Sequence, residues 1–360
     1  MKMGSIYSAS DKALFDAINN ASVTTSDLRL LFLKHGIVIS SKTPRKTLAE
    51  HYSRLIHDFN DFQSLAKLFD SGKRRERSSS FMINNGPPIS EYENAAHEVV
   101  EELKKNTDSA MLIKQMDGSI KIQIRYKVYN FNKSEFKQVE VKTATITIEE
   151  NSAGVLVRGP QNDKVDEVCR QLISAVSDKI DFVLKIDEIS LENNTNANQR
   201  TKFFVNLIDN LPGYPKHTVT DVYVYKPKLD AASNKDDIED EPLDEDPDLG
   251  IHITKASLKG QGVLESKEFS SLIENPEFYI SKIVWQSKPN GVDSDIYEFE
   301  AQFSEPETCT KFSYLVRGVY KYLNLEEHSK SRQHLDADDE LELNKVIEAS
   351  ARKSINKLTS

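Results

Sequence analysis

The sequence predicts an α+β protein, with a small all-helical N-terminal module followed by a body of two related, β-rich α+β lobes. Residues 9–69 repeat apolar side chains at helical spacing. Residues 120–128 instead alternate apolar and polar side chains, as a half-buried strand does. Later in the chain, one strand–helix–strand pattern occurs twice. A chain of 360 residues is too long to fold around one ordinary hydrophobic core, so we expect these parts to form separate domains.

The expected organisation has six segments. The helical module at residues 1–72 is followed by a basic linker with Ser and Pro at 73–89 and the first lobe at 90–229. An acidic disordered linker at 230–249, the second lobe at 250–325 and a C-terminal helix at 326–360 complete the chain. The acidic linker is predicted because residues 230–248 contain ten Asp or Glu, one Lys and two Pro, which makes this segment too polar to bury.

The helical module begins with an amphipathic stretch over residues 13–18. A second helix is expected to start at Thr25 or Ser26, because a hydroxyl there can cap the free N–H groups of the first turn. It should end at Gly36, which follows a basic last turn, and residues 37–39 then form a short extended link.

Two more helices complete the module. Thr43 is the expected N-cap of the third, with Pro44 at its first position, where the missing N–H costs nothing. An apolar stripe over residues 59–69 predicts the fourth helix. After the basic linker, a further amphipathic helix is expected over residues 90–105.

The body is expected to be rich in strands. Alternating and β-branched runs predict strands, and apolar residues at helical spacing predict the helices between them. The expected elements are strands at 120–128, 139–148 and 154–157, a helix from 163 to about 176, a strand at 182–191, a helix at 199–211, a strand at 219–225 and a last helix at 338–358.

An internal repeat supports the prediction of two lobes. A strand at residues 186–191 precedes the sequence Phe-x-x-Leu-Ile-acid-Asn at 204–210, and a strand at 253–258 precedes the same pattern at 269–275. In both places an aromatic residue and another strand follow. We interpret this as two copies of one β-α-β unit, stacked or paired, with the acidic linker between them. The alternative is a chance likeness of two amphipathic helices.

Charge is distributed unevenly along the chain. Residues 1–80 contain 13 Lys or Arg against 8 Asp or Glu, whereas the remainder contains 34 against 49. This asymmetry indicates a basic interaction module attached to an acidic body. A basic module favours an anionic partner such as nucleic acid.

Part of the module resembles a SAP module, a helix–extended link–helix unit that binds DNA. The resemblance lies within residues 22–60 and rests on the helix and link at 26–37 and the following 40–50 segment. The sequence departs from the family pattern at Ser41, where glycine is common, and at Thr43-Pro44 before the second helix. The resemblance implies contacts to the DNA backbone.

The residue types at positions 40–46, which we call the 40–46 step, support contacts to the DNA backbone independently of the resemblance. The N-terminus of a helix offers free N–H groups and a positive dipole end, both of which favour a phosphate. Lysine, arginine and hydroxyl side chains add backbone contacts with little sequence preference. The candidate DNA-binding residues are Ser40, Ser41, Lys42, Thr43, Arg45 and Lys46, with Lys73, Arg74, Arg75 and Arg77 as a flexible basic tail. The alternative is a solvated helix end and an ordinary charged linker.

A metal-dependent nuclease is the second hypothesis. Restriction-type nucleases pair an Asp with Glu-x-Lys on a neighbouring strand, so that the carboxylates hold Mg²⁺ and the lysine assists the attacking water. Asp117 and the Glu140-x-Lys142 segment could serve this purpose. The alternative for these residues is exposed charge across neighbouring strands.

No cofactor or resident metal is expected. His51 and His57 are six residues apart, which is not the spacing of metal ligands on one helix face, and no nucleotide-binding glycine motif occurs. The chain has two cysteines, Cys169 and Cys309, so no disulfide framework is expected. We therefore expect the protein in a reducing compartment. Without a signal peptide or a long apolar run, we expect a cytoplasmic protein that does not enter a membrane.

Together these observations predict a non-enzymatic DNA-binding or scaffolding protein. The N-terminal module would contact DNA with low sequence preference, and the lobes would bind a protein partner or a second copy of the chain. The nuclease, or a nuclease subunit, is the first alternative. A component that binds only proteins, through its N-terminal helices, is the second.

Overall fold

The computed structural model describes residues 10–19, 23–70, 75–105, 109–132, 135–227, 255–291, 293–324 and 327–359. The chain forms an α+β mixture with helices at its N-terminal end and a large sheet. It divides into two compact units, the first comprising Met1–Arg75, His97–Ile113 and Ile122–Thr145, and the second Glu76–Ala96, Lys114–Lys121 and Ile146–Ser360. The acidic linker expected at 230–249 lies outside the described residues.

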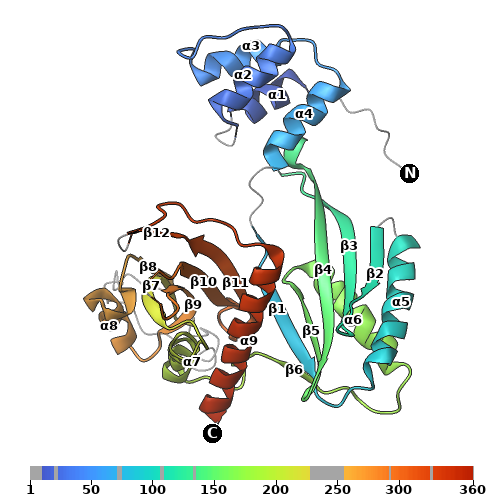
Figure 1. Ribbon diagram of the computed structural model, residues 1–360, viewed down its shortest axis with the longest axis vertical. Coiled ribbons are helices and arrows are strands. Elements are labelled where there is room, and N and C mark those ends of the chain that lie inside the picture. The colour runs from blue at the N-terminus through green and yellow to red at the C-terminus, as the bar shows by residue number, and fades with distance from the viewer. Residues whose placement is uncertain are drawn as a thin grey trace, which may run out of the picture. The chain divides into compact units, whose positions relative to one another are not determined.

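Four short helices begin the first unit, as the sequence predicts (Figure 1). They are α1 (Asp11–Asn19), α2 (Thr25–Lys34), α3 (Arg45–Ser53) and α4 (Phe59–Asp70). Their apolar stripes meet in one core, which contains Ile18, Leu28, Phe32, Leu48, Tyr52 and Leu65. This core explains why helices of 9 to 12 residues, too short to be stable alone, persist here.

The first unit also contains most of the elements from the middle of the sequence. These are the later part of α5 (Ile89–Lys105), most of β2 (Ser109–Lys114) and β3 (Ile120–Tyr129), the 3-10 turn η1 (Glu135–Lys137) and the first half of β4 (Val139–Asn151). Phe136 of η1 stacks on Phe62 of α4, with ring centroids 4.7 Å apart. The turn therefore contributes to the helical core.

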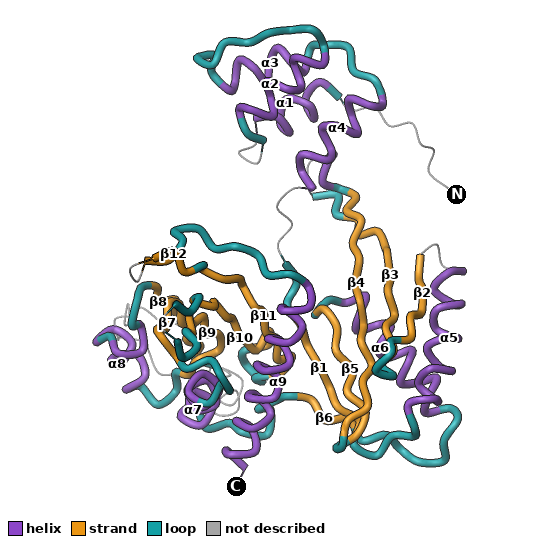
Figure 2. The backbone as a smooth tube through the Cα atoms, viewed as in Figure 1, coloured by secondary structure: helices purple, strands orange, loops and turns teal. Residues whose placement is uncertain are grey.

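Most strands of the second unit, which are orange in Figure 2, belong to one large sheet, and β12 (Tyr322–Asn324) and β13 (Glu327–His328) form a separate two-stranded sheet. From the later half of β4, the order is β4-β5-β1-β11-β10-β9-β7-β8, and β6 pairs with β1 beside this path. Neighbouring strands along this path pair antiparallel, and so do β1 and β6. The strands are β1 (Ser78–Ile83), β5 (Gly154–Pro160), β6 (Ile186–Glu188), β7 (Lys216–Tyr225), β8 (Lys255–Lys259), β9 (Tyr279–Ser287), β10 (Ile296–Glu305) and β11 (Thr310–Tyr320).

Strand β1 lies where the sequence predicts the linker 73–89, and this part of the prediction is corrected. The strand pairs with β5 over six residues, from Ser78 opposite Pro160 to Ile83 opposite Val155. It also pairs with β6 and, at Ser78, with Tyr314 of β11. Its first half is serine-rich, which is typical of a loop, but backbone hydrogen bonds to neighbouring strands hold it in the sheet.

The two repeated segments do form strand, helix and strand, as expected. The first is β6, α7 (Ala197–Asp209) and β7, and the second is β8, α8 (Lys267–Glu274) and β9. They do not form separate lobes, because β7 pairs with both β8 and β9. One hydrophobic core also collects Phe203 and Phe204 of α7 together with Phe269 of α8 and Trp285 of β9. The boundary between domains therefore does not fall at the acidic segment.

The C-terminal helix α9 (Ala337–Thr359) confirms the helix predicted over 338–358, and it belongs to the same core. It packs on β11 and on α7 (Figure 1). Arg158 of β5 donates to the Glu348 carboxylate of α9 at 2.9 Å, and the Tyr314 hydroxyl donates to it at 3.1 Å. The second unit also includes α6 (Asp163–Ser177), η2 (Val263–Glu265), β12 (Tyr322–Asn324) and β13 (Glu327–His328). No helix within the described ranges is long and apolar enough to cross a membrane.

Candidate nucleic-acid interface and charged sheet face

Helix α2 is fixed at both of its ends. Thr24, rather than Thr25 or Ser26, caps α2, and it exchanges hydrogen bonds with Asp27 in a capping box. The hydrogen bonds from the Thr24 side chain and backbone lower the pKa of Asp27. At the other end, Gly36 adopts a φ of +73° and donates to Leu33 at 2.9 Å. This left-handed stop confirms the predicted end of the helix.

The candidate DNA-binding step follows this stop. Ser40, Ser41, Lys42 and Lys46 are exposed, and Thr43 is half-buried. The Lys42 backbone N–H donates to Ser40 Oγ at 3.2 Å, which holds the step in a tight turn. Pro44 occupies the N-cap position of α3 and makes no side-chain capping bond, so Thr43 is not the cap. The first N–H groups of α3 therefore have no side-chain cap.

Arg45 has a different place from the one the sequence predicts. Its guanidinium donates to two backbone carbonyls, Ile18 O at 3.1 Å from Nε and Val23 O from the terminal nitrogen. These bonds tie the start of α3 to the end of α1 and the segment before α2. Arg45 thus positions the exposed residues beside it, and it contributes less directly to an interface.

The basic tail is corrected in part. Lys73 and Arg74 lie outside the described residues, and Arg75 is half-buried. Arg77 donates to the buried carboxylate of Glu300 at 2.7 Å, directly before β1, and is therefore part of the folded second unit. In addition, residues 10–70 contain 8 Lys or Arg and 7 Asp or Glu, so the folded helices are nearly neutral. Within these helices, the basic residues are concentrated in the local cluster at 40–46.

Apolar side chains are exposed on the same four helices. Leu30 and Leu33 of α2 keep 60% and 58% of their surface in solvent, and Ile56, between α3 and α4, keeps 93%. A groove of about 370 Å³ is lined by Leu30, Leu33 and Leu68, among others. Exposed apolar residues around a groove are typical of a surface that binds another protein.

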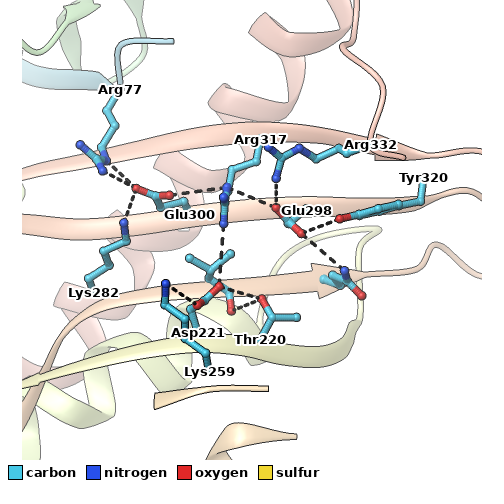
Figure 3. Close-up of polar contacts among 12 residues, drawn as sticks. Arg77, Thr220, Asp221, Lys259, Lys282, Glu298, Glu300, Arg317, Tyr320 and Arg332 are labelled. Carbon is cyan, nitrogen blue, oxygen red and sulfur yellow. Dashed lines mark hydrogen bonds and ion pairs between the residues drawn. The ribbon is translucent and has the colours of Figure 1, made fainter. Parts of the chain in front are cut away.

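A second arrangement lies on one face of the sheet and is shown in Figure 3. We call it the charged sheet face. It joins three carboxylates to five cationic side chains through ion pairs. Its residues are Asp221, Glu298 and Glu300, with Arg77, Lys259, Lys282, Arg317 and Arg332.

Glu300 is the most buried carboxylate of this face, with 3% of its surface exposed. It lies 2.9 Å from Lys282 Nζ and 3.7 Å from Arg317 Nε, and it also accepts from Arg77. Burial by itself would raise the pKa of Glu300, but the hydrogen bonds and charges of Lys282 and Arg77 outweigh burial and lower it. Glu300 is therefore ionised at neutral pH.

Glu298 and Asp221 extend the network to either side. Glu298 lies 3.2 Å from Arg317 Nε, accepts from the Tyr320 hydroxyl at 3.1 Å and pairs with Arg332. Asp221 lies 3.9 Å from both Arg317 and Lys259. Arg317 thus contacts all three carboxylates.

The chemistry of the charged sheet face is that of fixed charge. Each carboxylate is shared by two or more cations, which is a poor arrangement for a general base or acid. The cations exceed the carboxylates by two, so the face has a local positive excess within a body of negative net charge. Sequence reasoning did not find this site, because Glu298 and Glu300 alternate with apolar residues as on any half-exposed strand. Of the eight residues of this face, the sequence singled out Arg77 alone, as part of the predicted DNA-binding tail.

The residues of the nuclease hypothesis fall in different units. Asp117 is exposed at the turn before β3, where its Oδ1 accepts from the Ser119 backbone at 2.9 Å and from its hydroxyl at 2.7 Å. These hydrogen bonds lower the pKa of Asp117. Glu140 and Lys142 are half-buried on the part of β4 that belongs to the first unit.

Neither cysteine has the surroundings of a nucleophile. Both are free and buried. Burial raises the pKa of Cys169 to about 12 and that of Cys309 to about 11, so both thiols stay protonated. Cys169 lines a cleft of about 540 Å³ together with Asp166 and Arg170. Within the described part of the chain, the group that could hold a metal ion is His35, His57 and Asp61.

Comparison with known proteins adds no family to these observations. No protein-family model matches the chain, and no curated protein is significantly similar to it in sequence.

Proposed function

We propose that the chain is a non-enzymatic DNA-binding or scaffolding protein that contacts nucleic-acid backbone through the 40–46 step of its helical module. The observation that carries this proposal is the exposure of Ser40, Ser41, Lys42 and Lys46 beside the N-terminus of α3, whose N–H groups have no side-chain cap. Cations, hydroxyls and backbone N–H groups at the N-terminus of a helix are the ingredients of a phosphate contact. Such contacts carry little sequence preference.

The second unit would then bind a protein partner or a second copy of the chain. The charged sheet face supports this role, because its carboxylates hold cationic side chains in fixed positions that complement an anionic surface. We place the protein in the cytoplasm, since both cysteines are free and a reducing compartment keeps them so.

Duplex and single-stranded DNA binding by the full chain, measured by fluorescence anisotropy at several salt concentrations, tests the proposal. We compare the wild type with Lys42→Ala/Lys46→Ala and with the control Lys12→Ala/Lys67→Ala, which removes the same charge from exposed positions elsewhere on the module. Loss of two phosphate contacts should weaken binding about tenfold or more and reduce the slope of log affinity against log salt by about 2. The control should change neither quantity by as much.

Equal losses in the two variants would mean that net charge, and no particular site, governs binding, and no binding by the wild type would contradict the proposal. A parallel reaction with Mg²⁺ tests the nuclease alternative. Cleavage that Asp117→Asn abolishes would favour that alternative.

The exposed apolar residues of α2 favour a second function, which is binding of another protein. Leu30 and Leu33 line the groove beside α4 and keep more than half of their surface in solvent. An interaction through this groove would be insensitive to salt, because burial of apolar surface drives it. The salt series therefore separates it from DNA binding.

A further inference from the structure

Three potential metal ligands meet where α2, α3 and α4 end or begin. His35 is the C-cap residue of α2, His57 lies between α3 and α4, and Asp61 is in the first turn of α4. One ligand atom from each lies within 4.8 Å of the other two. The distance between His35 Nε2 and Asp61 Oδ1 is 3.6 Å. Two ligands on a tetrahedral ion with bonds of about 2.0–2.1 Å are about 3.3 Å apart, so this pair needs little movement to share an ion.

The hydrogen bonding of His57 leaves one ring nitrogen available. Its Nε2 lies 2.7 Å from the Tyr52 carbonyl oxygen, which can only accept, so the proton of the neutral ring sits on Nε2. The lone pair then sits on Nδ1, which is buried and has no hydrogen-bond partner among the described residues. A ring that donates to a backbone carbonyl from one nitrogen and offers the other is the usual arrangement of a metal-bound histidine.

The carboxylate of Asp61 is held by the start of its own helix. Its Oδ2 accepts from the Asp58 backbone N–H at 3.1 Å, and the Asp61 backbone N–H donates to Asp58 Oδ1 at 2.8 Å. This reciprocal pair is a capping box built from two aspartates. It occupies Oδ2 and leaves Oδ1 on the side of His35. The orientation of the ligand is thus set before any ion arrives.

His35 completes the group with a nitrogen that also has no hydrogen bond. Its Nε2 is buried and has no hydrogen-bond partner within the described ranges, and Asp61 Oδ1 lies just beyond hydrogen-bond distance. The ring is fixed edge-on against Tyr52 and His57, with centroids 5.6 Å and 5.4 Å apart. A buried polar atom without a hydrogen-bond partner destabilises the fold. The side chains of His35 and Asp61 each keep 19% of their surface in solvent, so an ion has a route to them.

We propose that His35, His57 and Asp61 bind one divalent transition-metal ion, for which two imidazoles and one carboxylate select Zn²⁺. The ion satisfies both ring nitrogens and joins the ends of three short helices, so it stabilises the helical module against unfolding. This inference does not depend on DNA binding. Sequence reasoning missed the site because it tested the spacing of His51 and His57 on one helix, whereas the ligands come from three different segments.

The test uses the full chain after removal of metal with a chelator that is then dialysed away. Zn²⁺ is titrated in by calorimetry, and Co²⁺ is added separately so that its visible absorption reports the coordination geometry. Three variants are compared with the wild type: His57→Gln, Asp61→Asn and the matched control His51→Gln, which alters an exposed histidine of α3. Asp61→Asn keeps an oxygen that can accept from Asp58 and therefore preserves the capping box.

We expect one tight Zn²⁺ site in the wild type and in His51→Gln, with the absorption of four-coordinate Co²⁺. His57→Gln and Asp61→Asn should each weaken Zn²⁺ binding on the order of 100-fold, because each removes a ligand. Added Zn²⁺ should raise the unfolding temperature of the wild type and leave that of His57→Gln unchanged. Circular dichroism of each variant checks that the helices are intact.

Equal Zn²⁺ affinity in the wild type, His57→Gln and Asp61→Asn would overturn the proposal, and so would a wild type that binds no Zn²⁺. The three side chains would then be only an ion pair and packed rings. A DNA-binding result of either sign leaves this outcome unaffected, so failure of one proposal is distinguishable from failure of the other.

Discussion

The two faces of strand β10 are almost equally hidden from solvent, yet they are built from opposite chemistry. Phe299 and Ala301 are fully buried in the aromatic core beneath α7 and α9, whereas Glu298 and Glu300 on the other face keep only 5% and 3% of their surface exposed. Neighbouring residues of one strand thus sit in environments that differ only by the direction in which the side chain points. The comparison shows that burial on a sheet does not require an apolar residue.

What each face requires for its stability is different. On the core face, Phe299 contacts the rings of Trp285 and Tyr214, with centroids 5.4 and 6.0 Å away, and removal of apolar surface from water drives the packing. On the charged sheet face, a buried carboxylate is tolerable only with several partners. Glu300 has three cations, contributed by β9, by β11 and by the segment before β1. The first face depends on volume and the second on charge balance.

The largest effect is expected on the core face. Phe299→Ala leaves a cavity among closely packed rings, so we expect it to lower the free energy of unfolding by about 4 kcal/mol. Urea denaturation followed by Trp285 fluorescence measures this loss, since Trp285 is the single tryptophan and lies against Phe299. Phe299→Leu should recover more than half of it. A loss below about 1 kcal/mol would mean that the core collapses around the gap.

Removal of the Glu300 charge from the charged sheet face should lower the free energy of unfolding by somewhat less. Glu300→Gln leaves Arg77 and Lys282 without their shared anion, so we expect a loss of about 3 kcal/mol, measured by the same denaturation. The cost stays below that of the cavity because both cations keep some contact with water, with 20% and 16% of their side chains exposed. Glu300→Leu combined with Lys282→Met should restore part of the stability, because apolar residues need no partner.

The smallest effect is a dependence on acid pH that only the charged face should show. The pKa of Glu300 is lowered in the folded state, so ionised Glu300 contributes stability above its unfolded pKa, about 4.3, and this contribution is lost as pH falls through the folded pKa. The difference in unfolding free energy between wild type and Glu300→Gln should therefore shrink as pH falls from 7 to 3. The deficit of Phe299→Ala should stay constant over this range. A Glu300→Gln deficit that does not change with pH would contradict the role assigned to its charge.

Much of the local structure could be predicted from sequence alone. Gly36 stops α2 in the left-handed conformation, and the alternating residues of β3 and the helical spacing in α5, α7 and α9 give elements close to the expected ranges. These signals are local, because they rest on backbone conformation and on the side-chain period within one element. Even the repeated strand–helix–strand order was found correctly.

The same local signals could not show which charged residues contact DNA and which have partners within the fold. Arg45 and Arg77 have the composition of DNA contacts, but Arg45 binds two carbonyls of its own module and Arg77 binds Glu300, which is 223 residues away in sequence. No periodicity within either segment could indicate these partners. The exposed cluster Ser40–Lys42 and Lys46 is what remains of the predicted interface within the described residues, and its binding role stays a prediction.

The sequence by itself therefore determined which segments become helices and strands, where several of them end, and that the class is α+β. Tertiary structure alone decided that both repeat copies share one sheet, that the serine-rich start of β1 pairs within it, and that His35, His57 and Asp61 meet. The physical reason is the distance along the chain over which each kind of interaction acts. Helix and strand signals act over one or two turns of chain, whereas strand order, buried ion pairs and ligand clusters depend on which distant segments the whole fold brings into contact.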